Sequence, residues 1–303
     1  MAPPPSTAPI VITGCSSGIG HASAVALHRA GYTVHATARR LESIADLKSL
    51  GLHTVALDVT DEASMALAVA TIQDQAGPIG VLINNAGYGL YGPVEQVSID
   101  DVRRQFETNF FGLVRLTQLV LPEMRRAQTG RILNVSSMGG RVTLPGGAFY
   151  HASKYAVEGL SDALRMELAQ FGIDVVLIEP GPVRTPWNDI ARDSMAVGGG
   201  TDSGTDSAHG ARTALRGAAD ADPYGPYKQA VAGSFDKAVN GPLARLGSTA
   251  DDIAEVIVKA VTARRPRTRY LINAVAKTLV ATRALLPDRL SDKVIGLQYG
   301  LPK

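Results

Sequence analysis

Short runs rich in β-branched residues alternate with longer helical patterns along most of this 303-residue chain, and this alternation is the strongest constraint on its fold. The runs predicted to be strands are Ile10–Thr13, Thr33–Thr37, Thr54–Leu57, Val81–Asn84, Arg131–Ser136, Val175–Glu179 and Arg269–Ile272. The segments predicted to be helices are Gly18–Ala30, Asp61–Gln75, Ile99–Met124, Tyr150–Gln170 and Ala250–Ala263. Because strands joined by helices favour right-handed crossovers, we expect an α/β fold: a doubly wound parallel sheet of seven strands flanked by helices.

A single domain of this kind accounts for the length of the chain, and we expect it to span residues 10–275 after a disordered lead at residues 1–9. Residues 187–246 break the alternation and are predicted to form a substrate loop or lid, with a flexible Gly/Ser/Asp-rich part at residues 198–207. Spaced apolar residues interrupted by a proline predict two short helices in a C-terminal extension, residues 276–303. We leave open whether this extension covers a pocket or touches a membrane surface.

The composition argues against several classes of protein. A net charge of +2 is too small to indicate binding to nucleic acid or to an anionic membrane. No uncharged apolar run approaches the roughly 20 residues that a transmembrane helix needs. Cys15 is the only cysteine, which excludes an internal disulfide and favours the cytoplasm. The six histidines show no metal-ligand spacing. We therefore expect a cytoplasmic protein without a bound metal.

A glycine-rich loop, TGCSSGIG at residues 13–20, follows the first predicted strand and opens the first predicted helix. Its glycines allow a tight turn and a close approach of the backbone to a pyrophosphate, while the helix N-terminus supplies N–H groups and a positive dipole. This context indicates a Rossmann-type dinucleotide site. For Cys15 we favour loop packing over a redox role, although a helix N-terminus can lower a thiol pKa. The loop residues expected to contact the dinucleotide are Gly14, Ser16, Ser17, Gly18, Ile19 and Gly20.

The end of the second predicted strand bears on the choice between NAD and NADP. An NAD site usually places an acid there for the ribose 2′-hydroxyl, whereas an NADP site places an arginine for the 2′-phosphate. This strand ends in Arg39 and Arg40 without an acid, so we favour NADP(H) over NAD, with solvated surface arginines as the alternative. Asp58, at the end of the third strand, is a candidate acceptor for the adenine amino group; alternatively, it is an N-terminal acid of the next helix.

Tyr150 and Lys154 form a Tyr-x-x-x-Lys pair at the start of a predicted helix, where residues four apart share one face. A phenol with a pKa near 10 is a poor base at neutral pH, but a nearby cation lowers that pKa. Carbonyl reduction also needs a group that polarises the same oxygen. Ser136 and Ser137 both qualify by type; the thirteen-residue offset to Tyr150 favours Ser137, with Ser136 bonding locally. The three residues predict redox chemistry.

Together these motifs resemble the short-chain dehydrogenase/reductase family in its compact single-domain form. Residues 13–20 match its TGxxxGxG loop, Asn84–Gly87 its NNAG motif and Pro180–Thr185 its PGxVxT turn. The stretches Gly87–Gly92 and Tyr150–Lys154 are similar to the subgroup around 17β-hydroxysteroid and retinol dehydrogenases. That similarity implies a lipophilic alcohol or ketone as substrate.

The resemblance also implies roles for individual residues. Tyr150 would exchange the hydroxyl proton, Lys154 would hold the nicotinamide ribose and lower the phenol pKa, and Ser137 would polarise the carbonyl. Asn109 would position a water that links Lys154 to solvent. Besides Tyr150, Lys154 and the residues named above, the implied cofactor contacts are Val59, Asn85, Ala86, Gly87, Pro180, Gly181, Val183 and Thr185.

The predicted function is therefore an NADP(H)-dependent dehydrogenase or carbonyl reductase acting on a lipophilic secondary alcohol or ketone. A non-catalytic NADP(H)-binding regulatory or sensor protein is the alternative, which the intact Ser137, Tyr150 and Lys154 argue against. A dehydratase or epimerase is disfavoured by the glycine spacing. Family members often pair through the helices predicted at Ile99–Met124 and Tyr150–Gln170, which implies a homodimer or homotetramer. An apolar pocket is predicted from Leu90, Tyr91, Met138, Leu144, Phe149 and Trp187.

Overall fold

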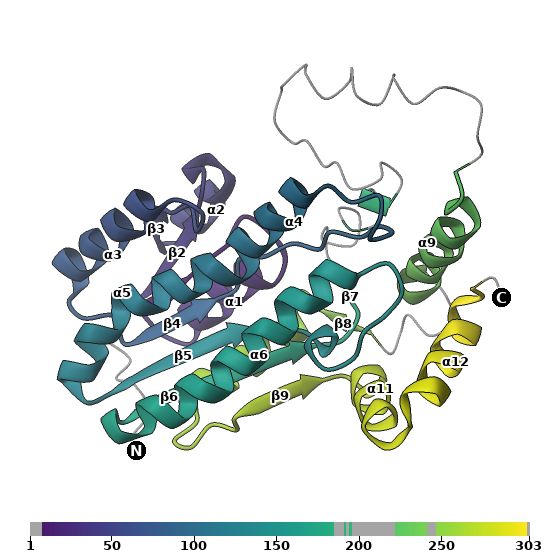
Figure 1. Ribbon diagram of the computed structural model, residues 1–303. Helices are drawn as coiled ribbons and strands as arrows, with labels where there is room; N and C mark the ends of the chain where they lie inside the picture. Colours follow the sequence, from purple (N-terminus) through teal and green to yellow (C-terminus); the bar gives the residue numbers. More distant parts are fainter. Residues whose placement is uncertain (1–7, 185–190, 192–193, 196–221, 241–246, 302–303) are drawn as a thin grey trace.

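The computed structural model describes residues 8–184, 191, 194–195, 222–240 and 247–301. Its centre is a parallel sheet of seven strands in the order β3-β2-β1-β4-β5-β6-β9 (Figure 1). The order reverses between β1 and β4, the point at which doubly wound sheets bind ligands. The predicted α/β fold is confirmed. The strands are β1 (Ile10–Ile12), β2 (Val34–Ala38), β3 (His53–Ala56), β4 (Val81–Asn84), β5 (Gly130–Val135), β6 (Ile173–Pro180) and β9 (Arg269–Ile272).

Helices cover both faces of this sheet. Side chains alternate along β1: Ile10 and Ile12 pack in one buried cluster with α1 and α10, while Val11 packs in another with α3 and α5. Figure 1 shows α5 and α6 running side by side across the second of these faces. The helices that follow the first five strands are α1 (Gly18–Arg29), α2 (Ala45–Ser49), α3 (Glu62–Ala76), α4 (Ile99–Phe106), α5 (Gly112–Ala127) and α6 (Ala148–Leu168), and α10 (Ala250–Thr262) comes later, before β9.

The helix predicted at Ile99–Met124 is interrupted. Between α4 and α5 the backbone forms a π-helical turn at Glu107–Phe111, an arrangement often found at functional sites. The reason lies in tertiary contacts that helical periodicity does not reveal: Asn109, inside this turn, exchanges two hydrogen bonds with the backbone of Tyr88. The prediction of one continuous helix is therefore wrong at this point.

The predicted excursion at residues 187–246 contains a helix that the sequence analysis did not predict, α9 (Gly225–Asn240). Much of the rest, including residues 198–207, lies outside the described residues, as does most of the predicted lead. A small two-stranded sheet, β7 (Val183–Arg184) with β8 (Ser248–Thr249), flanks the segment. No helix in the described ranges is long and apolar enough to cross a membrane.

The chain ends in two short helices, as the interrupted apolar spacing predicts. They are α11 (Ala274–Leu285) and α12 (Asp288–Tyr299), and they lie beside α9 at the end of the sheet where β9 terminates (Figure 1). Asn273 begins α11 by accepting a hydrogen bond from the backbone of Ala276 at 2.9 Å. The C-terminal helices are thus joined directly to the edge strand of the sheet.

His35 in β2 is a buried titratable group whose protonation opposes folding. It is fully buried, its ring is stacked on His53 with centroids 4.7 Å apart, and neither ring nitrogen has a hydrogen-bond partner among the described residues. Burial, with a smaller effect of nearby His53, lowers the pKa of His35 from 6.5 to about 4. In the unfolded chain the ring takes up a proton at a higher pH than in the folded protein. The contribution of neutral His35 to stability is therefore lost as the pH falls from about 6.5 towards 4.

We expect a His35→Phe variant, which keeps a ring against His53 but cannot titrate, to lose less stability in acid than the wild-type protein. Between pH 7.5 and 4.5 the fall in the free energy of unfolding should shrink by about 2 kcal/mol. Urea denaturation at the two pH values measures this difference. Equal falls in the two proteins would contradict the assignment.

Candidate active site

Close backbone contacts shape the loop between β1 and α1. Gly14 has φ +71°, and a Cβ there would lie 2.9 Å from Ala86 Cα. A Cβ at Gly20 would lie 2.4 Å from the Gly14 carbonyl oxygen and 2.5 Å from Asn85 Nδ2. Asn85 Nδ2 donates to the carbonyls of Thr13 and Gly14 at 2.8 and 3.2 Å. The loop therefore requires glycine at both positions, and it is fastened to the end of β4.

The outer side of this loop is accessible. Ser16 and Ser17 are exposed, and Ser17 begins α1 without a side-chain capping bond. A surface without bulky side chains at a helix N-terminus fits the pyrophosphate of a dinucleotide.

Cys15, in the same loop, points the other way: it is fully buried and its Sγ donates to the Ile12 carbonyl at 3.3 Å. Burial raises the pKa of this thiol to about 12, which agrees with the interpretation that Cys15 packs the loop and has no redox role.

The residues predicted for the adenosine end lie at the carboxyl ends of β2 and β3. Arg39 and Arg40 directly follow β2 and are exposed. Asp58 Oδ1 accepts hydrogen bonds from the backbone and the hydroxyl of Thr60 at 2.9 and 2.8 Å. The acid that caps α3 is Asp61, so Asp58 is not the capping residue of that helix. Val59 follows and packs against the start of α5, where a Cβ at Gly112 would lie 2.2 Å from the Val59 carbonyl oxygen.

Ser137, Tyr150 and Lys154 come together where β5 ends beside α6. Tyr150 and Lys154 are 7% and 6% exposed, and Lys154 Nζ lies 5.9 Å from the centroid of the Tyr150 ring. Lys154 Nζ also donates to the Val135 carbonyl at 2.9 Å, which ties α6 to the end of the strand. The Ser137 hydroxyl accepts from Gly139 N at 3.0 Å, and Ser137 lies close enough to the Tyr150 phenol to lower its pKa.

Burial opposes charge on both titratable groups of this set. It raises the pKa of Tyr150 from 10.0 to about 12, an effect that the hydrogen bond with Ser137 partly offsets. Burial also lowers the pKa of Lys154 from 10.5 to about 8, and the carboxylate of Glu158 acts in the opposite direction. Near neutral pH the site therefore holds a protonated phenol beside a lysine whose charge depends on its neighbours.

Asn109 lies behind Lys154, in the π-helical turn. Its Nδ2 donates to the Tyr88 carbonyl at 2.9 Å and to Ser153 Oγ at 3.1 Å, while its Oδ1 accepts from Tyr88 N at 3.0 Å. Gly87 lies over the group: a Cβ there would be 3.1 Å from Asn109 Oδ1 and 3.6 Å from Lys154 Nζ. The amide thus holds the loop after β4 in place next to the lysine.

The remaining predicted cofactor residues follow β6. Pro180 is the last residue of that strand, and Gly181 packs on Asn273, whose Oδ1 would lie 2.5 Å from a Cβ at position 181. Val183 pairs with Ser248 in the small sheet. Thr185, like Trp187 of the predicted pocket, lies outside the described residues.

An apolar wall surrounds Tyr150, and most of it comes from residues that the sequence analysis missed. Of the residues predicted to line a pocket, Tyr91 is placed there, with its ring centroid 5.8 Å from that of Tyr150. Met138 and Leu144 instead pack against α11. The missed residues are Ala191 and Met195 and residues of α9 and the C-terminal segment, where the signal was only weak apolar spacing. The cluster consists of Tyr91, Tyr150, Ala191, Met195 and Val231, with Tyr227, Tyr299 and Leu301 packed against it.

Comparisons with known proteins agree with this fold. The sequence profile of the family described as short chain dehydrogenase matches residues 8–196. The chain is 37% identical over 300 residues to retinol dehydrogenase 8 of Bos taurus, covering 95% of this chain and 88% of the relative. It is 33% identical over 298 residues to an NADPH-dependent 3-dehydrocapnine reductase of Ornithobacterium rhinotracheale, covering 94% of both chains.

A solved structure extends the similarity to three dimensions. The crystal structure of a short-chain dehydrogenase from Streptomyces avermitilis superposes with a TM-score of 0.74 at 29% identity, covering 95% of this chain and 94% of that one. The chain belongs to the short-chain dehydrogenase family and is an oxidoreductase of that type, with a fold that binds a nicotinamide dinucleotide.

Proposed function

We propose that this enzyme transfers a hydride between NADP(H) and a lipophilic secondary alcohol or ketone, with Ser137, Tyr150 and Lys154 as its catalytic residues. The observation that carries the proposal is that buried Tyr150 and Lys154 lie together, with Lys154 Nζ 5.9 Å from the centroid of the phenol ring, and that Ser137 lies near enough to lower the Tyr150 pKa. In this arrangement both hydroxyls can reach one substrate oxygen. The nicotinamide dinucleotide, when bound, supplies or accepts the hydride.

The chain's own residues would handle the proton and the developing charge. In the reducing direction, Ser137 donates a hydrogen bond to the carbonyl oxygen and polarises it, and Tyr150 gives that oxygen its proton. The phenolate left behind is unfavourable in a buried site, as the raised pKa of Tyr150 shows. The Lys154 ammonium stabilises it by its charge. In the opposite direction the same phenolate accepts the proton of the alcohol.

The preference for NADP(H) rests on the exposed guanidiniums of Arg39 and Arg40 after β2, where charge-assisted hydrogen bonds to a 2′-phosphate are available. The relative from Ornithobacterium rhinotracheale is by name NADPH-dependent. The preference for a lipophilic substrate rests on the apolar wall around Tyr150, and the name retinol dehydrogenase of a second relative supports it.

We expect Tyr150→Phe to lower kcat for carbonyl reduction by about 10²-fold or more, because the proton donor is lost, while the Kd for NADPH stays nearly unchanged. Oxidation of NADPH followed at 340 nm with a panel of lipophilic ketones and aldehydes measures the rate. Tyr155→Phe, an exposed tyrosine on the same helix, is the matched control and should keep full activity.

Turnover that survives in Tyr150→Phe would reject the proposed mechanism. Tight binding of NADPH by the wild-type protein, without oxidation across the whole panel, would favour the alternative of a regulatory or sensor protein.

We expect Arg39→Ala to weaken NADPH binding about tenfold to hundredfold, since one charge-assisted hydrogen bond is worth about 1.5–3 kcal/mol, and to leave NADH binding unchanged. Arg29→Ala, an exposed arginine at the end of α1, is the control. Fluorescence titration of both cofactors measures the Kd values. Equal weakening of NADH and NADPH, or no change for either, would contradict a 2′-phosphate site at Arg39.

We also propose that the enzyme forms a dimer through the outer faces of α5 and α6. Three large apolar side chains are exposed in this region: Phe111, directly before α5, at 50%, and Tyr155 and Met166 on α6 at 43% and 73%. Tyr155 and Met166 are eleven residues apart and share one helical face. Light scattering at micromolar protein should give twice the chain mass, and Met166→Glu should shift the protein towards the monomer. A monomeric mass for the wild-type protein would reject the dimer.

A further inference from the structure

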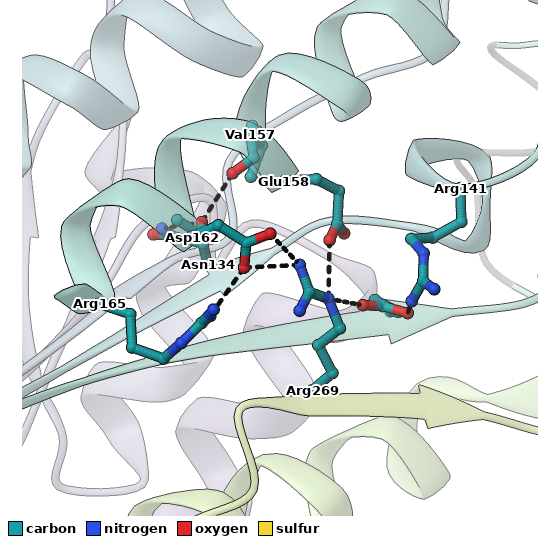
Figure 2. A network of polar contacts seen from close by, with 9 residues as sticks. Asn134, Arg141, Val157, Glu158, Asp162, Arg165 and Arg269 are labelled. Atoms are coloured by element: carbon teal, nitrogen blue, oxygen red, sulfur yellow. Dashed lines mark hydrogen bonds and ion pairs between the residues drawn. The ribbon is translucent and has the colours of Figure 1, made fainter.

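A network of charges lies next to Lys154, and the catalytic roles proposed above do not use it. Its two glutamates are buried: Glu158 follows Lys154 by one helical turn on α6 and is 6% exposed, and Glu179 on β6 is fully buried. Figure 2 shows the guanidinium of Arg269, from β9, next to the carboxylate of Glu158. Its Nε lies 3.2 Å from Glu158 Oε2 and 3.1 Å from Glu179 Oε1.

Further side chains complete the network (Figure 2). Arg269 Nη2 donates to both oxygens of Asp162 at 2.7 Å, and Asp162 also pairs with Arg165 at 2.8 Å. Arg141, in the turn that follows Ser137, lies 3.5 Å from Glu179 Oε2. Three carboxylates thus face three guanidiniums, so the network balances its own charge when every member is ionised.

The network reaches the catalytic residues through tightly packed atoms. A Cβ at Gly140 would lie 2.9 Å from Glu158 Cγ, 3.0 Å from the Lys154 carbonyl oxygen and 2.8 Å from Ser136 Oγ. The turn after Ser137 therefore rests on the helical segment that carries Lys154 and Glu158. No bulky side chain separates the glutamate from the catalytic serine turn.

We propose that Glu158 is a positioning residue that acts on catalysis through Lys154: its carboxylate, paired with Arg269, keeps the Lys154 ammonium charged beside Tyr150. This inference rests on the proposed function, in which that ammonium stabilises the phenolate. Removing the negative charge leaves the buried ammonium with fewer favourable interactions, so Lys154 should lose its proton at a lower pH.

The titration of the neighbouring groups agrees with this direction. The carboxylate of Glu158 raises the pKa of Lys154, against the larger lowering by burial. Burial, and secondarily the charge of Glu158, raises the pKa of Glu179 to about 7, while Arg141 and Arg269 lower it. Of these two acids, Glu158 is the one on the helix of Lys154. The charged groups around it are Lys154 on α6, Glu179 on β6, Arg269 on β9, which it shares with Asp162, and Arg141 in the turn after Ser137, while Ser136, directly after β5, contributes its hydroxyl.

The test is a direct titration of Lys154 in protein labelled with ¹³Cε-lysine, with the resonance assigned by a Lys154→Met variant. We expect Glu158→Gln to lower the pH at which Lys154 titrates by about one unit. Asp162→Asn is the matched control, because it also removes a carboxylate that pairs with Arg269, but at a position two helical turns from Lys154. It should leave the pH at which Lys154 titrates unchanged. An unchanged Lys154 titration in Glu158→Gln would overturn the inference whether or not a substrate is known.

The conservative variant separates charge from packing. Glu158→Asp keeps the carboxylate. In this variant the pH at which Lys154 titrates should lie close to the wild-type value, even if the melting temperature is lowered. A purely structural role predicts that Glu158→Asp and Glu158→Gln behave alike, and that result would reject the proposal.

The pH profile of kcat connects the titration to catalysis. In Glu158→Gln the alkaline limb for carbonyl reduction should move to lower pH by the same amount as the Lys154 titration. A shifted titration with an unshifted profile would reject the link to catalysis. A wild-type protein that reduces no carbonyl, together with a shifted titration, would reject the proposed function but support the coupling between Glu158 and Lys154.

Discussion

A ladder of buried side-chain hydrogen bonds connects the sheet to the catalytic helix, and the active site depends on it. Asn84 Nδ2 donates to Asn134 Oδ1 at 2.9 Å, from β4 to β5, and Asn134 Nδ2 donates to Ser161 Oγ on α6 at 2.9 Å. Buried amides left without partners are costly, so one placement of α6 is strongly favoured. That placement brings Lys154 to the end of β5, where its Nζ bonds the Val135 carbonyl.

The fold was predictable because buried parallel strands are nearly continuous apolar runs. Val81–Asn84 and Arg269–Ile272 have the predicted bounds, and the other five predicted strands differ by one or two residues at one or both ends. The failures lie where tertiary contacts override local pattern. The π-helical turn around Asn109 depends on its bonds to Tyr88, and α9 contains a proline and two glycines that hide its helical signal.

The candidate site was predictable to a similar degree. The Tyr-x-x-x-Lys spacing is local, so it identified two side chains that the structure places together, and Ser137 joins them as its offset suggested. The sequence did not identify Glu158 as part of the site, because a glutamate four residues from a lysine ordinarily indicates a solvated helix face. Only burial, and the distant Arg269, distinguish it from such a pair.

Most of the apolar wall around Tyr150 comes from elements other than those that carry the proposed catalytic residues. The residues proposed to handle the proton lie between positions 109 and 154, whereas Val231, Tyr227 and Tyr299 come from α9 and α12. Substitutions in the later helices would alter the apolar packing around Tyr150 and leave the proposed catalytic residues unchanged. After gene duplication, the substrate of such an enzyme can therefore change while its reaction stays the same.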